Sequence, residues 1–205
     1  MTSSPIDALV FDLGGVVVGH DNALLYRRLA SRCRAEGWTA ERVRALAADP
    51  RWGTGTPVAE LHAELRRDAG YDGDSETFAA DWCCHLVVDP SMLAFVEELA
   101  ARRRVMIFSN TNPVHWDFVV AASGGRLAAF ERHLSYEIGH EKPSLRSFQI
   151  VAEIAGLQPQ AMLFFDDVAA NVEGARRAGF QSEVFEGEAA LRRLLVDRNL
   201  GGAAA

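Results

Sequence analysis

Short apolar runs alternate with longer stretches of helical periodicity along most of the chain. The runs at 8–11, 105–108 and 161–165 are rich in β-branched or aromatic residues and stop at turn-forming residues, which predicts buried strands. Weaker strands are expected at 183–185 and 133–136. Helical patterns lie at 91–103, 113–123, 144–155, 169–178 and 188–198. Strands that alternate with helices imply right-handed crossovers, so we predict an α/β fold with a doubly wound parallel sheet.

The long interval between the first two strands breaks this alternation. From about Asp21 to Val88 the pattern is helical only. Leucines recur at helix-like intervals: Leu24, Leu25, Leu29, and later Leu61 and Leu65. This predicts an insertion of three or four helices packed over the strand ends. The expected division is a core domain of residues 1–18 and 89–205 with a helical domain of residues 19–88.

Composition and charge exclude several classes of function. The 205 residues are 49% hydrophobic and 24% charged, as in ordinary globular proteins, which argues against disordered and fibrous classes. There are 21 basic and 28 acidic residues, a net charge of −7, so no general affinity for nucleic acid or anionic membranes is expected. A phosphate ligand would therefore need a local site and a cation.

The cysteines and the N-terminus indicate a compartment. Cys33, Cys83 and Cys84 form no even set and lack metal-ligand spacing, so they are interpreted as reduced thiols. The opening MTSSPID has no signal-peptide pattern, and no apolar stretch approaches the ~20 residues that span a bilayer. We expect a cytoplasmic protein with no membrane partner, either a monomer or a homodimer.

Polar residues follow three of the predicted strands. Asp12 comes where the first apolar run stops, before two glycines that allow a sharp turn. Ser109 and Asn110 follow the second run and offer donors that suit an anion. Ligands of open α/β sheets bind outside the carboxyl ends of the strands, so these side chains are expected to converge.

A pair of acids and a lysine complete the pattern. Asp166 and Asp167 directly follow the strand predicted at 161–165. Adjacent acids repel each other unless a cation lies between them and Asp12. Asn171 follows on the first turn of the next helix. Lys142, just before Pro143, can supply the one positive side chain that such a site needs.

These four elements, in this order, resemble the four motifs of the haloacid dehalogenase-like hydrolase superfamily. More closely, FDLGGVVV, SNTNPVHW, IGHEKPSLRSF and FFDDVAANVEGARRAG resemble the small bacterial phosphatases of this superfamily that act on glucose 1-phosphate and related sugar phosphates. The helical insertion resembles the cap of that superfamily. The resemblance implies a Rossmann-like core and Mg²⁺-dependent hydrolysis of a small phosphorylated metabolite.

The resemblance also implies roles for individual residues. Asp12 would attack phosphorus and form an aspartyl-phosphate, which splits one difficult displacement into two easier ones. Mg²⁺ would be held by Asp12, the main-chain carbonyl of Gly14 and Asp167, with Asp166 beside it, orienting metal water or pairing with Lys142. Asn171 would support these ligands from behind. The groups expected to grip the phosphate oxygens are Ser109, the amide of Asn110 and Lys142.

One position departs from most phosphatases of the superfamily. In most of these phosphatases the residue two positions after the nucleophile is a second Asp, which transfers protons. Here that residue is Gly14, so the ~10²–10⁴-fold rate contribution of general acid–base catalysis is missing. Either the helical insertion supplies this group, with His20 and Asp21 nearest in sequence, or a sugar leaving group needs little protonation. Alternatively, the protein is a slow or non-catalytic phosphate binder, or a 2-haloacid dehalogenase. His115 and Trp116 are further candidates for the substrate pocket.

Overall fold

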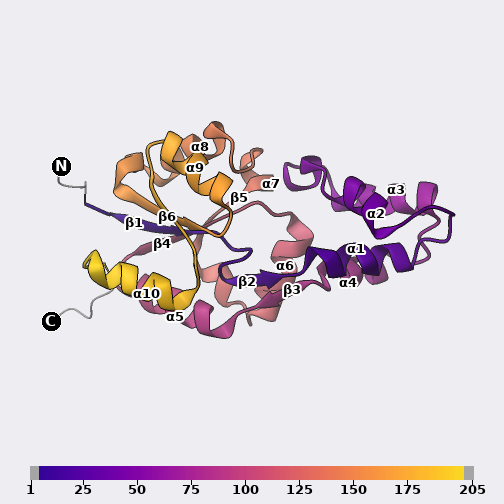
Figure 1. Ribbon diagram of the computed structural model, residues 1–205, viewed down its shortest axis with the longest axis horizontal. Helices are drawn as coiled ribbons and strands as arrows, with labels where there is room; N and C mark the ends of the chain where they lie inside the picture. Colours follow the sequence, from indigo (N-terminus) through magenta and orange to yellow (C-terminus); the bar gives the residue numbers. More distant parts are fainter. Residues whose placement is uncertain (1–4, 201–205) are drawn as a thin grey trace.

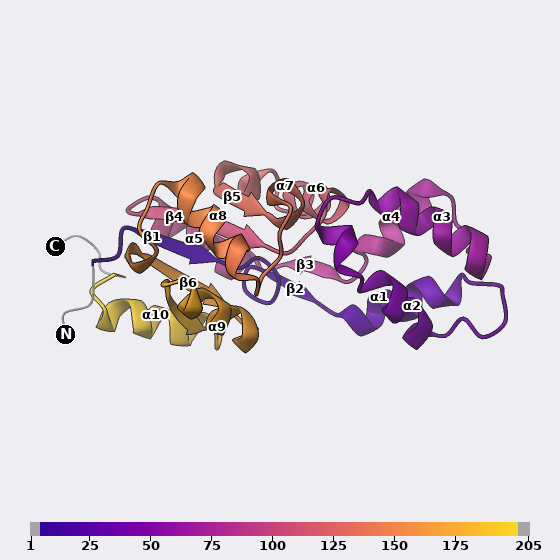
Figure 2. The same ribbon diagram turned by 90° about the horizontal axis from the view of Figure 1, so that it is seen from above.

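The computed structural model describes residues 5–200, and in it the chain forms an elongated molecule with a sheet at one end and a group of helices at the other (Figures 1 and 2). The central sheet has five strands in the order β5-β4-β1-β6-β7, all parallel. Their bounds are β1 Ala8–Phe11, β4 Arg104–Ser109, β5 Glu131–Leu134, β6 Met162–Asp166 and β7 Gln181–Val184. The predicted parallel α/β sheet is confirmed.

Helices cover both faces of this sheet (Figure 1). Helices α8 Leu145–Ala155 and α9 Ala169–Arg177 lie on one face, where Phe148 packs with Val10 and Phe164. Helices α5 Pro90–Ala100, α6 Pro113–Ala122 and α10 Glu188–Asp197 contribute to the apolar cluster on the other face. Since successive side chains of a strand point to opposite faces, the central strands must be apolar throughout.

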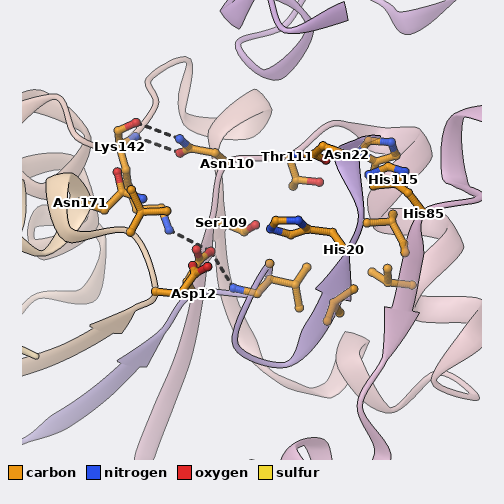
Figure 3. Close-up of a pocket in the computed structure, with 17 residues that line it drawn as sticks. Asp12, His20, Asn22, His85, Ser109, Asn110, Thr111, His115, Lys142 and Asn171 are labelled. Carbon is orange, nitrogen blue, oxygen red and sulfur yellow. Dashed lines mark hydrogen bonds and ion pairs between the residues drawn. The ribbon is translucent and has the colours of Figure 1, made fainter. Parts of the chain in front are cut away.

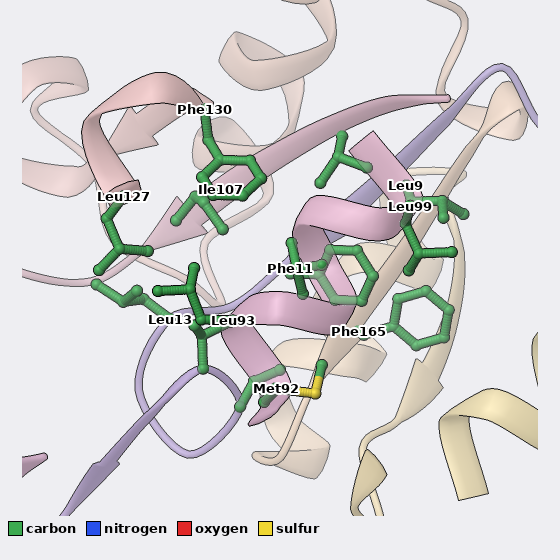
Figure 4. Close-up of a cluster of buried hydrophobic side chains, with 14 of the residues drawn as sticks. Leu9, Phe11, Leu13, Met92, Leu93, Leu99, Ile107, Leu127, Phe130 and Phe165 are labelled. Carbon is green, nitrogen blue, oxygen red and sulfur yellow. The ribbon is translucent and has the colours of Figure 1, made fainter. Parts of the chain in front are cut away.

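The cluster between β1, β6 and α5 anchors the strand that carries Asp12 (Figure 4). Phe11 and Phe165 stack with their ring centroids 5.1 Å apart, and Met92 and Leu93 of α5 belong to the same buried cluster. Each buried side chain of this size contributes roughly 1.5–3 kcal/mol. The backbone position of Asp12, which follows Phe11, is therefore held in place by this packed cluster.

Each of the two edge strands begins two residues earlier than predicted. β5 begins at Glu131 instead of 133, and the expected continuation through Tyr136 is the short helix α7 Ser135–Ile138. β7 begins at Gln181 instead of 183. Both strands start with polar residues because an edge strand is partly exposed, so hydrophobicity does not mark where it begins.

Four helices form the other end of the molecule, with an apolar cluster of their own (Figure 2). They are α1 Asn22–Ser31, α2 Ala40–Ala47, α3 Val58–Ala69 and α4 Ser75–Cys83, with the 3-10 turn η1 Pro50–Gly53 between α2 and α3. Leu25, Leu29, Leu61 and Leu65 are buried in this cluster, as their spacing predicts, whereas Leu24 of the same predicted set is exposed. The remaining short turns are η2 Arg126–Ala129 and η3 Pro159–Ala161.

The expectation of helix alone between Asp21 and Val88 was wrong at one place. Leu86–Val88 forms strand β3, which pairs antiparallel with β2 Val18–His20. This two-stranded ribbon joins the helices to the sheet (Figure 1). Three residues are too few to show a strand period, and the partner is about seventy residues away in sequence. None of the helices in residues 5–200 combines the length and apolar character needed to cross a bilayer.

Candidate active site

The polar residues predicted from three strand ends lie together at one edge of the sheet; Figure 3 shows two of them, Asp12 and Ser109. Asp12 follows β1, while Ser109 and Asp166 are the last residues of β4 and β6. Because β4 and β6 are the two neighbours of β1, these three residues come from adjacent strands. The main-chain N–H of Asp12 donates to the carbonyl of Phe165 at 2.8 Å, which extends the β1–β6 pairing to the site.

Lys142 is buried between two carboxylates. Its Nζ lies 2.8 Å from Asp12 Oδ1 and 2.6 Å from Asp166 Oδ2, and its side chain is fully excluded from solvent. The rings of Phe108 and Phe164 flank the ammonium with centroids 5.3 and 5.2 Å away. A buried cation needs such close partners, because the desolvation penalty is several kcal/mol per ion.

Asp166 is held on several sides. Asn171 Nδ2 donates to both of its oxygens at 3.0 Å, and the N–H of Val168 donates to Oδ1 at 2.8 Å. Together with Lys142 these donors satisfy a fully buried carboxylate. Asp166 is therefore fixed in position and forms an ion pair with Lys142.

Three carboxylates form the only cluster of His, Cys, Asp or Glu within residues 5–200 that could hold a metal ion. One oxygen each of Asp12, Asp166 and Asp167 lies within 4.8 Å of the others. The side chain of Asp167 packs against Gly15. A Cβ at position 15 would lie 2.2 Å from Asp167 Oδ2, and φ of Gly15 is +74°. Only glycine fits that position. Clustered carboxylate oxygens suit Mg²⁺, a hard cation.

Burial dominates the ionisation of Asp12. It raises the pKa of Asp12 to about 7, an effect that the charge of Lys142 opposes and the nearby Asp166 reinforces. The side chain is otherwise well positioned, since Oδ1 also accepts a hydrogen bond from the N–H of Leu13 at 2.7 Å. A further positive charge at this cluster would favour the anionic, nucleophilic form of Asp12.

The side chain of Asn110 binds the backbone of Lys142. Its Oδ1 accepts from the N–H of Lys142 at 2.9 Å, and its Nδ2 donates to the carbonyl of Lys142 at 2.8 Å. This leaves the main-chain N–H as the part of Asn110 that could meet a phosphate. Ser109 presents its hydroxyl to the pocket beside Asp12 (Figure 3).

A cavity of about 310 Å³ opens in front of these groups. Its polar lining comes from Asp12, Ser109, Asn110, Lys142, Asp167 and Asn171 on the sheet side, and from His20, Asn22, His85, Thr111 and His115 on the other. A second cavity of about 180 Å³ shares five of these residues and adds Tyr26, Asp49, Trp52, Trp82, Asn112 and Glu141. The combined space suits a small ligand that reaches from the sheet edge toward α1 and η1.

Two residues expected in the pocket do not line it. Asp21 is exposed and caps α1, where its Oδ1 accepts from the N–H of Leu24 at 3.0 Å. Trp116 is buried in the core with Arg132 5.3 Å from its ring. Neighbouring residues of a strand or helix point in different directions, so the His20–Asp21 and His115–Trp116 pairs each place one member in the pocket.

Neither Asn22 nor His85 was expected in the pocket from the sequence, and both line it. Thr111, which follows Ser109 and Asn110 at the end of the second predicted strand and offers a hydroxyl donor like them, lines it as well. His85 is 5% exposed, and its Nδ1 is buried without a hydrogen-bond partner among the described residues. The three apolar residues of β3, which directly follow His85, give no indication that His85 would face polar groups.

The histidines around the cavity differ in their partners. Burial, with repulsion from His20, lowers the pKa of His85 to about 4. Burial, with repulsion from His85, lowers the pKa of His115 to about 3. His115 Nε2 lies 3.0 Å from the carbonyl of Trp82, and the two rings stack at 4.9 Å. Both His85 and His115 are therefore uncharged near neutral pH.

Similarity to known proteins agrees with this geometry. A family model described as haloacid dehalogenase-like hydrolase matches residues 6–179. Phosphatase MT3486 of Mycobacterium tuberculosis is 30% identical over 213 residues, which cover 95% of this chain and 88% of that protein. D-ribitol-5-phosphate phosphatase of Bacteroides thetaiotaomicron is 28% identical over 101 residues, covering 46% of this chain and 49% of that protein.

Solved structures share the fold. An enzyme of this family from Bacteroides thetaiotaomicron, crystallised with magnesium and inorganic phosphate, is 26% identical with a TM-score of 0.76, covering 89% of this chain and 96% of that one. L-2-haloacid dehalogenase from Xanthobacter autotrophicus is 22% identical with a TM-score of 0.61 over 96% of this chain and 85% of that one, a likeness of fold alone. With the strand-end carboxylates and the family match over most of its length, the chain belongs to the haloacid dehalogenase-like hydrolase family and is a phosphatase of that family.

Proposed function

We propose that this phosphatase is Mg²⁺-dependent and hydrolyses small phosphomonoesters, sugar phosphates above all, through an aspartyl-phosphate on Asp12. The observation that carries the proposal is the position of Asp12, held by Lys142 at 2.8 Å and facing a cavity beside two further carboxylates. A carboxylate fixed in this way can attack phosphorus in line with the leaving oxygen.

The groups that would grip the phosphoryl oxygens come from two loops. The Ser109 hydroxyl, the main-chain N–H of Asn110 and the Lys142 ammonium would each donate to a non-bridging oxygen. This assignment is supported by the position of all three residues in the lining of the cavity that Asp12 faces. Neutralising the charge on these oxygens is most of what catalysis of phosphoryl transfer requires.

Mg²⁺ would be held by Asp12, the main-chain carbonyl of Gly14 and Asp167, with Asp166 beside it. The fit rests on three carboxylate oxygens within 4.8 Å and on a glycine that lets Asp167 approach the turn. When bound, Mg²⁺ supplies positive charge to the transferring phosphoryl group. A relative crystallised with magnesium and inorganic phosphate supports the choice of ion.

The helices of residues 19–88 would act as the cap of a core formed by residues 1–18 and 89–205. Residues 1–4 and 201–205 of that core lie outside the described part of the chain. The cap would exclude bulk water and select the leaving group, which disfavours protein or nucleic-acid substrates. The second cavity supports a hydroxyl-rich leaving group, because Asp49, Asn112 and Glu141 offer hydrogen bonds beside Trp52 and Trp82.

Phosphate release from a panel of sugar phosphates and p-nitrophenyl phosphate tests the proposal. We expect release with Mg²⁺ from the wild type, none in EDTA, and none from Asp12→Asn, which keeps the size of the side chain but not its nucleophilicity. Asp7→Asn, an exposed acid before the opposite end of β1, should behave like the wild type. Mass spectrometry of quenched reactions should find one phosphoryl group on the peptide that contains Asp12.

Two results would contradict the proposal in different ways. Equal activity of wild type and Asp12→Asn, or no release from any compound, would favour a protein that mainly binds phosphate. Halide release from 2-haloacids that persists in EDTA would favour a dehalogenase instead.

A further inference from the structure

The side chain that is absent at Gly14 leaves a space that another residue fills. A Cβ built at Gly14 would lie 3.2 Å from His20 Cδ2 and 3.6 Å from His20 Nε2. A side chain at position 14 would therefore project into the imidazole edge of His20. Both residues line the main cavity together with Asp12 (Figure 3).

The backbone turn after Asp12 brings His20 to this place. The N–H of Gly15 donates to the carbonyl of Val18, and the N–H of Val18 donates to the carbonyl of Leu13, both at 2.8 Å. The chain then enters β2, whose last residue is His20 and whose pairing with β3 fixes its direction. Eight residues after the nucleophile, the chain thus presents a ring to the cavity from the side of Gly14.

His20 is the pocket histidine whose ring is free to bind a ligand. His115 has Nε2 at 3.0 Å from the Trp82 carbonyl and Nδ1 at 3.1 Å from Asn112 Nδ2. His85 is 5% exposed, whereas His20 is exposed. Among residues 5–200, no side chain or backbone group forms a hydrogen bond with the His20 ring.

We propose that His20 replaces the missing carboxylate as the residue that transfers protons to the leaving oxygen and from the attacking water. This inference rests on the proposed phosphatase mechanism at Asp12 and adds the group that the mechanism lacks. The observation behind it is that one imidazole occupies the space of the absent side chain while remaining open to the substrate.

The two half-reactions balance. In the first, the Asp12 carboxylate forms a bond to phosphorus, the bond from phosphorus to the leaving oxygen breaks, and that oxygen takes the proton of the His20 imidazolium at Nε2. The alcohol leaves, and neutral His20 remains beside the aspartyl-phosphate. In the second, Nε2 takes a proton from water while the water oxygen attacks phosphorus and the bond to Asp12 breaks. Inorganic phosphate leaves and His20 is again protonated.

Leaving-group dependence tests the proposal. His20→Gln keeps a polar side chain of similar reach but cannot transfer a proton in this way. For a phosphate ester of a simple alcohol or sugar hydroxyl, kcat/KM of His20→Gln should fall by ~10²–10⁴. For p-nitrophenyl phosphate, whose leaving oxygen needs no proton, kcat/KM should fall by less than about tenfold. Nitrophenolate should then appear as a burst before slow turnover, because hydrolysis of the intermediate still lacks its base.

Asp21→Asn is the matched control. Asp21 adjoins His20 in sequence and was the competing candidate, but it points away from the cavity and caps α1, a role that asparagine also fills. Its kcat/KM should match the wild type for both substrates. The thermal unfolding midpoint of His20→Gln should also stay close to the wild-type value, since the ring is exposed.

The inference and the mechanism beneath it can fail separately. If wild-type activity depends on Asp12 but His20→Gln slows both substrates equally, or slows neither, His20 is not the proton-transfer residue. A loss in Asp21→Asn that is confined to the alkyl ester would assign the role to Asp21. If Asp12→Asn remains active, the aspartyl-phosphate mechanism itself is wrong.

Discussion

The carboxamide of Asn110 holds the backbone of Lys142 through two hydrogen bonds, one in each direction. Oδ1 accepts from the Lys142 N–H at 2.9 Å and Nδ2 donates to the Lys142 carbonyl at 2.8 Å. The loop that carries the buried ammonium is thereby tied to the end of β4, next to Ser109. Asn110, whose main-chain N–H is expected to contact the phosphate, thus also fixes the position of Lys142 through its side chain.

Asn110→Ala should remove this link without touching the reacting groups. We expect kcat/KM to fall by about 10²-fold, since small displacements of a catalytic group have effects of this size. The free energy of unfolding should fall by about 1–3 kcal/mol, because two backbone groups of Lys142 lose their partners. Steady-state kinetics and urea unfolding measure both effects. Gln149→Ala, at an exposed position of α8, is the control and should change neither quantity. Unaltered activity and stability in Asn110→Ala would show that these two hydrogen bonds do not position Lys142 for catalysis.

Lys142→Met should destabilise the protein as well as inactivate it. Removal of the ammonium leaves Asp12 and Asp166 buried without their cation, and breaking a buried pair costs about 3–5 kcal/mol. Chemical unfolding in EDTA measures the loss.

Lys142→Met with Asp166→Asn should recover part of that stability, because one buried charge is gone, while activity stays absent. If the double variant is no more stable than the single one, uncompensated charge is not the cause of the destabilisation.

Mg²⁺ should raise the unfolding temperature of the metal-free protein. At a concentration 100 times its dissociation constant, an ion that binds only the folded state adds about 2.7 kcal/mol. We expect the shift to disappear in Asp167→Asn, because Asp167 is the exposed member of the carboxylate cluster. Asp117→Asn, an exposed acid on α6, should retain the full shift. A full shift in Asp167→Asn would remove that residue from the metal site.

Acid should destabilise the fold through His85. The pKa of His85 is about 4 in the folded protein because of burial and the neighbouring His20, against an ordinary value of 6.5. As the pH falls from 7 to 5, the unfolded chain binds a proton at this position that the folded chain does not, so His85 contributes a loss of about 2 kcal/mol of stability. His115, with its pKa lowered to about 3, contributes in the same direction, and Asp12, with its pKa raised to about 7, contributes in the opposite one.

Urea unfolding at pH 7, 6 and 5 measures this loss. His85→Asn should lose about 2 kcal/mol less than the wild type between pH 7 and 5, while His140→Gln, at an exposed position, should leave the dependence as in the wild type. A wild-type slope in His85→Asn would show that other groups cause the acid sensitivity.

Glu141 should affect substrate binding more than chemistry. It lines the second cavity, and burial together with Asp49 raises the pKa of its carboxyl above the ordinary value. Glu141→Gln should increase KM for sugar phosphates several-fold and leave KM for p-nitrophenyl phosphate nearly unchanged, since that leaving group has no hydroxyls to bind. The exposed Glu186→Gln is the control. Equal effects on both substrates would show that the second cavity does not hold the leaving group.

Much of the core could be predicted because its signals are local. The strands that carry Asp12, Ser109 and Asp166 are buried on both faces, so each appears as a continuous apolar run that ends at a polar residue. Parallel strands align their carboxyl ends at one edge, which brings these residues together whatever the loops between them do. Edge strands such as β5 and β7 were less well placed, because one side of each is solvated.

Other parts of the site depended on contacts between distant segments. The pairing of β2 with β3 determines that His20 faces the cavity while Asp21 caps a helix, and Asn110 meets Lys142 across thirty-two positions of sequence. The sequence by itself therefore determined which strands carry the reacting groups, through burial and the order of its motifs. Only the tertiary structure decided which neighbouring side chains turn toward the cavity, because that direction is imposed by pairing and packing with residues far along the chain.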